Sequence, residues 1–215
     1  MTVQPAGSEY PARLTIDYAE QHDRARTFLR VFMVIPIMIV LAVLTAGATQ
    51  TVYDRSGEVV RHSTGGITAG LFVATLLMIL FRQRYPRWWF DFALELTRFS
   101  TRVGAYFVLL TDQYPSTVEE QSVHLQLDYP DAERDLNRWL PLVKWLFAIP
   151  HLIVLSVLTV GAFFAVVMAW FAIMFTGQYP RGLFDFVVGV SRWWLRVQAY
   201  ATLLVTDRYP PFSLT

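Results

Sequence analysis

The 215-residue sequence contains no cysteine, which excludes disulfide bonds, thiolate catalysis and cysteine-ligated zinc or iron–sulfur sites. Charged residues are scarce, at 16% of the chain, while hydrophobic residues make up 54%. A soluble domain has roughly 25% charged residues, so this balance favours a polytopic membrane protein. The net charge is +1, so the chain lacks the strongly basic character that would indicate nucleic acid as a partner.

Catalytic and cofactor motifs are missing as well. The sequence has no glycine-rich phosphate loop, nucleophile elbow, zinc-protease motif or dinucleotide fingerprint. None of the four histidines has another three or four positions away, which is the spacing expected for metal ligands on a helix. These histidines are His22, His62, His124 and His151. We therefore expect no metal, no cofactor and no enzymatic activity.

The chain contains one long stretch twice, at residues 85–115 and 179–210. Each copy reads Tyr-Pro-Arg, then Phe-Asp-Phe, two arginines four positions apart, Ala-Tyr, and finally Thr-Asp-x-Tyr-Pro. Upstream, residues 14–18 match 125–129, and residues 42–47 match 156–161. Matches in the same order over both halves predict an internal duplication, with about 20 residues inserted after Gly47 in the first half.

The predicted fold class is an all-α integral membrane protein with two tandem repeats. We expect each repeat to contain a short strand, two transmembrane helices and an interfacial amphipathic helix, related by a pseudo-twofold axis along the membrane normal. The predicted segments are a tail (1–12), a first repeat (13–115), a linker (116–123) and a second repeat (124–212). In the first repeat the strand is 13–18, the spans are 28–49 and 67–81, and the amphipathic helix is 88–110. In the second the strand is 124–129, the spans are 139–159 and 161–176, and the amphipathic helix is 182–205.

Three details of the spans follow from the sequence. Pro36 predicts a kink in the first span, and the polar residues 50–66 predict a small hairpin that turns at Ser56–Gly57. The apolar run from residue 139 to 175 would form a helix about 55 Å long, against a hydrocarbon core of about 30 Å. We therefore expect it to break near residues 159–162. The two predicted strands could pair, although two strands alone are marginally stable.

Basic residues precede the first and third predicted spans and follow the second and fourth. The positive-inside rule then places both termini in the cytoplasm and predicts a multi-pass protein of the inner membrane. The polar N-terminal segment contains no signal peptide.

A polar stripe runs along each amphipathic segment. Its members are Asp91, Glu95, Arg98 and Arg102 in the first copy and Asp185, Gly189, Arg192 and Arg196 in the second. We favour helices lying in the interface, although spanning helices are an alternative that would make the repeats inverted. The four arginines are candidate sites for anionic headgroups or phosphate. Alternatively, they snorkel, with Asp91 and Asp185 as structural partners.

The remaining candidate residues lie near the ends of these segments and in the third span. Asp112 and Asp207 follow threonine and precede Tyr-Pro, which is typical of a turn or helix end; a carboxylate acting as base or ligand is the alternative. Tyr106 and Tyr200 belong to the same repeated motif as structural candidates. His151 is an ionisable residue inside an apolar run and so a functional candidate, or it bonds to a carbonyl.

The repeated motif resembles that of a family of bacterial and archaeal membrane proteins defined only by a domain of unknown function, often present in two copies. The resemblance extends from about Leu14 to Phe212, and it is most specific at residues 206–212, Thr-Asp-Arg-Tyr-Pro-Pro-Phe. The first copy departs from the pattern, with Gln113 and Ser116 where the second has Arg208 and Pro211. The resemblance implies an integral membrane location and no known activity.

We expect a non-enzymatic scaffold or accessory subunit of a membrane complex. Its partners would be anionic lipid headgroups and another membrane protein or further copies of the chain. Two alternatives stay open. One is a small-solute or ion transporter or channel with its path between the repeats, using His151 and the arginine stripes. The other is a lipid-headgroup enzyme using Asp112 or Asp207.

Overall fold

The computed structural model describes residues 10–45, 49–53, 59–63, 66–116, 119 and 121–215. This part of the chain is mostly helical, in agreement with the predicted class. In chain order its elements are β1 (Ala12–Ile16), α1 (Arg24–Thr45), β2 (Thr49–Tyr53), β3 (Val59–Ser63), α2 (Ile67–Arg82), α3 (Arg87–Phe107), β4 (Val123–Leu127), α4 (Pro141–Thr176) and α5 (Arg181–Ala201).

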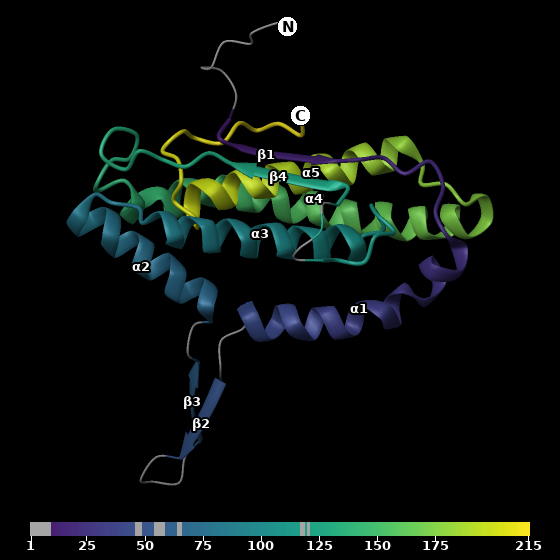
Figure 1. Ribbon diagram of the computed structural model, residues 1–215, viewed down its shortest axis with the longest axis horizontal. Coiled ribbons are helices and arrows are strands. Elements are labelled where there is room, and N and C mark those ends of the chain that lie inside the picture. Colours follow the sequence, from purple (N-terminus) through teal and green to yellow (C-terminus); the bar gives the residue numbers. More distant parts are fainter. Residues whose placement is uncertain (1–9, 46–48, 54–58, 64–65, 117–118, 120) are drawn as a thin grey trace, which may run out of the picture.

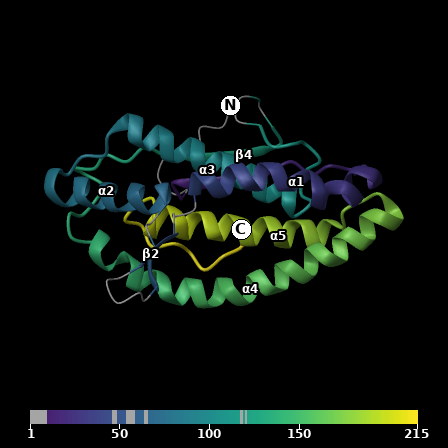
Figure 2. The ribbon, with the colours of Figure 1, turned by 90° about the horizontal axis from the view of Figure 1, so that it is seen from below.

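The elements form layers along one long axis (Figure 1). A ribbon of β1 and β4 covers α3 and α5 on one side, and the C-terminus lies on this same side. Helices α1 and α2 lie on the opposite side, and the β2–β3 hairpin projects beyond them. Figure 2 shows α4 and α5 running side by side along the body. The fold therefore has a ribbon side and an opposite helical side.

The two predicted strands exist and pair with each other. β1 and β4 are antiparallel, with Leu14 opposite Leu125 and Thr15 opposite His124. Both leucines are buried, whereas Thr15 and His124 are exposed. A two-stranded ribbon is marginal alone, but here its apolar face joins the core formed with α3 and α5. Both strands begin one residue earlier than predicted. Ala12, the last residue of the predicted tail 1–12, therefore belongs to β1. Residues 1–9 of that tail lie outside the described part.

Each strand packs on the amphipathic helix of the other half. Arg192 on α5 donates from Nε to the Leu14 carbonyl of β1 (3.0 Å), and Arg98 on α3 donates from Nε to the Leu125 carbonyl of β4 (3.1 Å). These contacts link residues 178 and 27 positions apart. The two halves are therefore interleaved rather than stacked as separate domains.

A second matched pair of contacts crosses in the same way. The Tyr18 hydroxyl donates to the Tyr179 carbonyl (2.5 Å), and the Tyr129 hydroxyl donates to the Tyr85 carbonyl. The acceptors belong to the two Tyr-Pro dipeptides. The prolines that follow, Pro86 and Pro180, cap α3 and α5, and each accepts the amide of the residue four positions later (3.0 Å). The Tyr-Pro-Arg motif thus starts a helix and anchors the other half's strand segment.

The predicted break in the second half is wrong. Helix α4 runs unbroken for 36 residues and passes through 159–162. Length alone predicted the break, but nothing in that segment ends a helix: Gly161 costs only about 1 kcal/mol relative to alanine. Pro150 is accommodated within α4. The helix ends at Gly177, whose φ of 77° is the left-handed conformation typical of a glycine C-cap. The two predicted spans 139–159 and 161–176 are thus one helix.

Helix α1 has the predicted kink. Its segments Arg24–Arg30 and Phe32–Thr45 meet at 48°, which fits Pro36, since a proline disrupts contacts with the carbonyl four residues earlier. Strands β2 and β3 are antiparallel, with Thr49 opposite Ser63, as expected for the hairpin; the proposed turn at Ser56–Gly57 lies outside the described residues. The other predicted helices differ from α1, α2, α3 and α5 by four residues or fewer at each end.

Within the described residues, α4 is the one helix long and apolar enough to cross a membrane, and α1 qualifies as a second if its bent segments count as one span. Only 17% of the most apolar 18-residue stretch of α4 is buried. A core helix of a soluble protein is mostly buried, so α4 indicates membrane association. Four spans are not supported by this structure.

Candidate functional site

Asp112 lies at the centre of a buried polar cluster at the start of α1. Its Oδ1 accepts from Arg30 Nη2 and lies 2.9 Å from His22 Nδ1, and its Oδ2 accepts the Asp23 amide at 2.9 Å. Arg30 is 2% exposed and also donates from Nη1 to the Tyr106 carbonyl (3.1 Å). Its guanidinium carbon lies 4.6 Å from the centre of the Tyr106 ring. The carboxylate thus neutralises the buried cation of α1.

Asp207 occupies the corresponding place at the start of α4. Its Oδ1 lies 2.6 Å from Lys144 Nζ, and its Oδ2 accepts the Asn137 amide at 2.5 Å. Lys144 is fully buried and donates from Nζ to the Thr206 carbonyl (2.8 Å). Its ammonium lies 5.1 Å from the centre of the Tyr200 ring. This cluster repeats the chemistry of the first with lysine in place of arginine.

The two clusters are built from residues at matching positions. Arg30 and Lys144 are 114 positions apart, as are the amide donors Asp23 and Asn137. Both donors also cap the following segment, because Asp23 Oδ1 accepts the Ala25 amide (2.9 Å) and Asn137 Oδ1 accepts the Trp139 amide (3.0 Å). The arrangement agrees with the predicted duplication, which itself stays a prediction.

The Thr-Asp-x-Tyr-Pro motifs form tight turns that aim these carboxylates. Leu109 and Leu204, just before the motifs, have positive φ of 68° and 56°. Thr111 Oγ1 then accepts the Gln113 amide (3.2 Å), and Thr206 Oγ1 accepts the Arg208 amide (3.1 Å). Each turn reverses the chain after an amphipathic helix and returns the aspartate to the start of an apolar helix.

Sequence reasoning missed the partners of these aspartates. Arg30 and Lys144 are 114 positions apart, which is the offset at which residues 42–47 match 156–161, so this spacing is a signal that could have found them. His22 was excluded as a metal ligand but is fully buried in its side chain and paired with Asp112. Burial raises the pKa of Tyr106 and Tyr200, so both phenols stay neutral beside the cations.

The four stripe arginines bond to the protein itself. Arg98 also pairs with Glu95 (2.5 Å), and Arg102 donates to the Ser116 carbonyl (2.7 Å). Arg192 and Arg196 donate to carbonyls of residues 213–215 in the C-terminal segment as well. The four arginines therefore face the ribbon, Ser116 and the C-terminal segment.

Lipid contact by these arginines stays a prediction. Their proposed acidic partners Asp91 and Asp185 are exposed and form no ion pair within the described part of the chain.

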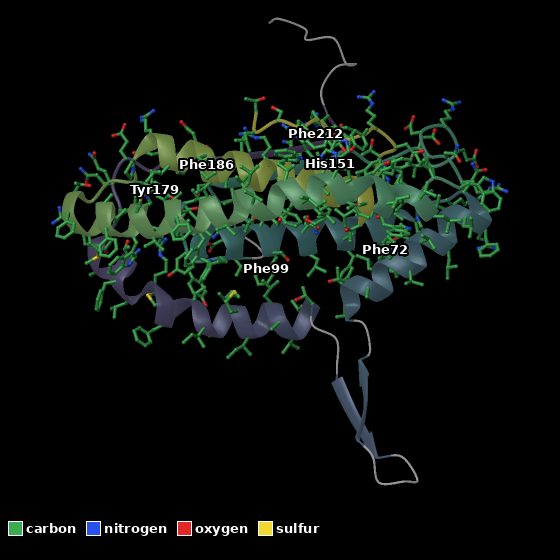
Figure 3. The ribbon with its side chains drawn as sticks, turned by 180° about the vertical axis from the view of Figure 1, so that it is seen from behind. Phe72, Phe99, His151, Tyr179, Phe186 and Phe212 are labelled. Atoms are coloured by element: carbon green, nitrogen blue, oxygen red, sulfur yellow. The ribbon has the colours of Figure 1, made fainter. Side chains whose placement is uncertain are left out.

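His151 lies in an aromatic cluster rather than along a polar path. Its Nδ1 accepts from Trp193 Nε1 at 3.1 Å, and its ring stacks on Phe212 with centroids 3.9 Å apart (Figure 3). The Tyr209 ring lies 4.7 Å away. The side chain is fully buried, and its contacts fix the C-terminal segment against α4 and α5. Among the described residues, no group of three or more histidine or acidic side chains is placed to hold a metal ion.

The second half of the chain matches a known family model. The match is to the Domain of unknown function (DUF4389), over residues 139–213. Residues 139–213 are a DUF4389 domain. The domain contains α4, α5 and the turn with Asp207, and therefore the Lys144–Asp207 ion pair. Comparisons with curated proteins and with solved structures gave no match.

The Lys144–Asp207 pair makes a first prediction. In Asp207→Asn, a buried ammonium loses its counter-ion, which costs about 3–5 kcal/mol, so we expect a clearly lower melting temperature in mild detergent. The double variant Lys144→Met/Asp207→Asn removes both charges and is expected to recover most of the loss. Asp185→Asn, at an exposed position, serves as the matched control. A melting temperature for Asp207→Asn equal to that of the control would show that the pair contributes nothing.

Asp112 predicts a dependence of stability on acid pH. Burial alone would raise its pKa, but hydrogen bonds from His22 and the Asp23 amide, with the charges of His22 and Arg30, outweigh it and lower the pKa from 3.8 to about 2. A carboxyl whose pKa is lower in the folded state contributes stability above its unfolded pKa, and this contribution is lost as the pH falls toward 2. The difference in unfolding free energy between wild type and Asp112→Asn should therefore shrink between pH 5 and pH 2. A difference that stays constant over this range would contradict the assignment.

Proposed function

We propose that this protein is a non-enzymatic integral membrane scaffold that acts as an accessory subunit of a membrane complex. The observation that carries the proposal is the exposed apolar surface of α4. Its most exposed large side chains are Val157 (69%), Phe163 (64%) and Phe175 (78%). Soluble proteins rarely leave apolar patches of this extent uncovered, so lipid or a protein partner is expected to cover them.

The helical side of the molecule exposes apolar side chains and the ribbon side exposes charged ones, as expected for a protein at a membrane surface. Helix α1 exposes Phe32 (68%) and Val43 (72%) on the helical side. On the ribbon side the exposed residues include Asp17 and His124, which pair with each other at 3.1 Å. In our proposal α1, α2 and α4 contact the acyl chains, α3 and α5 lie near the headgroups, and the ribbon faces the cytoplasm.

The ribbon constrains how α4 sits in the membrane. At the start of α4, Lys144 pairs with Asp207, and the next residue, Arg208, accepts a hydrogen bond from Tyr10 (3.2 Å) just before β1. At its end, the Gly177 carbonyl accepts the His22 amide (2.9 Å), a few residues after β1. One polar segment thus reaches both ends of α4.

If α4 crossed the bilayer, this ribbon segment and its charges would have to cross with it, at a cost of several kcal/mol. We therefore place α4 within one leaflet, along the membrane surface. Helix α2 slopes from the body toward the projecting β2–β3 hairpin, whereas α1 runs along the same long axis as α4 (Figures 1 and 2). We propose that α1 and α2 enter the acyl layer and tilt in the bilayer, so that the hairpin reaches the far side. Both termini then lie in the cytoplasm, in agreement with the positive-inside pattern, and the protein is multi-pass in the inner membrane.

The contacts of the charged candidates favour a scaffold over the two alternatives. A headgroup enzyme would need Asp112 or Asp207 free to take a proton, but each forms an ion pair with a buried cation and accepts a backbone amide. A transporter would need ionisable groups along a path, but His151 is enclosed by aromatic rings. In our proposal, exposed basic residues in the first turn of α1 and before α4, such as Arg26 and Arg134, contact anionic headgroups.

Single cysteines test the membrane placement, since the chain has none of its own. We expect Gln50→Cys to react with an impermeant maleimide added outside intact cells, and Glu133→Cys to react only after the cells are opened. Val160→Cys, in the middle of α4, should resist labelling from both sides because it lies on the apolar face that lipid or a protein partner covers. Labelling of Val160→Cys from outside would show a hairpin at this point and overturn the placement of α4.

Photo-crosslinking tests the accessory role. A photoreactive amino acid at Val157, on the exposed face of α4, is expected to give one protein adduct of defined mass in native membranes. The same amino acid at Glu133, an exposed residue before the start of α4, is the control for random collision. If position 157 gives only lipid adducts, or the same adducts as position 133, the protein is not an accessory subunit through this face.

A further inference from the structure

A cavity of about 630 Å³ lies between the second half of α4, the middle of α5, the end of α3 and the start of α1. Most of its wall is apolar, with Phe163, Val166 and Trp170 from α4 and Val187 and Val190 from α5. This volume falls within the range of about 300–1,000 Å³ that is usual for ligand pockets. The cavity is therefore large enough for a sizeable apolar molecule.

Two buried polar atoms in the wall lack partners. Thr27 is fully buried and Arg30 is 2% exposed, and both residues line the cavity. Thr27 Oγ1 and Arg30 Nε form no hydrogen bond within the described part of the chain. A buried donor without a partner costs about 1–3 kcal/mol. Both atoms belong to one turn of α1, so a single oxygen-bearing ligand group can satisfy them.

Two other polar side chains in the wall already form hydrogen bonds within the protein. Thr159 Oγ1 accepts from Trp194 Nε1 (3.1 Å), and Ser191 Oγ donates to the Val187 carbonyl (2.9 Å). Polar recognition is thus concentrated at the α1 end, while the rest of the cavity accepts only apolar groups. The charge of Arg30 is balanced by Asp112, so the ligand's polar group need not be an anion.

We propose that this cavity binds one long-chain acyl group, with its carbonyl or carboxylate oxygen at Thr27 and Arg30 and its hydrocarbon chain along α4 and α5. Arg30 Nε and the Thr27 hydroxyl donate to the acyl oxygen, and the aromatic and branched side chains cover the chain. The acyl group can come from a free fatty acid or from one chain of a membrane lipid, since both present the same atoms to the site. The site does not depend on how α4 lies in the membrane, so either proposal can fail without the other.

Native mass spectrometry of the full-length protein in mild detergent tests the site, with ¹³C-labelled palmitate as the probe. We expect wild type to carry one acyl-bearing molecule per chain. Its mass identifies the source: a bound phospholipid that palmitate does not displace, or a fatty acid that exchanges with the labelled one. Val166→Trp places a large side chain in the cavity and should lower occupancy at least tenfold. Thr27→Val removes one donor at nearly constant volume and should lower it several-fold.

Val157→Trp is the matched control, because Val157 lies on the exposed face of α4 and does not line the cavity. Circular dichroism melting curves establish that each variant is folded. A folded Val166→Trp protein with the occupancy of Val157→Trp would overturn the site, as would wild type without an acyl adduct in saturating palmitate. Unchanged occupancy in Thr27→Val would overturn the assigned position of the acyl oxygen.

Discussion

The structure depends on the need to neutralise a buried cation at the start of each long apolar helix. Arg30 and Lys144 are almost inaccessible to solvent, and an unpaired charge in such a place is prohibitively expensive. Asp112 and Asp207 provide the counter-charges, and each comes from the turn that follows an amphipathic helix. The pair therefore fixes where the chain must turn and which helix end the turn must meet.

The interleaving of the two halves depends on these two ion pairs, which position the turns after α3 and α5. With α3 and α5 placed by their turns, their polar stripes lie where β1 and β4 can accept hydrogen bonds from Arg192 and Arg98. Every arginine of the stripes thus has an internal acceptor, which explains how an amphipathic helix can carry two arginines without leaving them in lipid. It also explains why Asp91 and Asp185 are not their partners: backbone carbonyls of the ribbon, of Ser116 and of the C-terminal segment take that role, together with Glu95.

Much of the local structure could be predicted from the sequence. Alternation of polar and apolar residues indicated both strands, and Pro36 indicated the bend in α1. The unbroken α4 could not be predicted, because length was weighed against bilayer thickness without knowing that the helix packs lengthwise beside α5. The ion pairs were missed for a related reason. Thr-Asp before Tyr-Pro is a sufficient signal for a turn, but only the long-range arrangement shows which buried cation the carboxylate faces.

The crossing of β1 onto α5 and of β4 onto α3 has a consequence for how such a fold can be assembled. A chain that contained only the second half would expose the face of α5 that β1 covers, and its own strand would have no helix to lie on. Two such chains could satisfy both needs by exchanging strands across a common axis. In this protein both strand–helix contacts form within one polypeptide. The chain between α3 and β4 connects the two halves covalently, so their association does not depend on protein concentration.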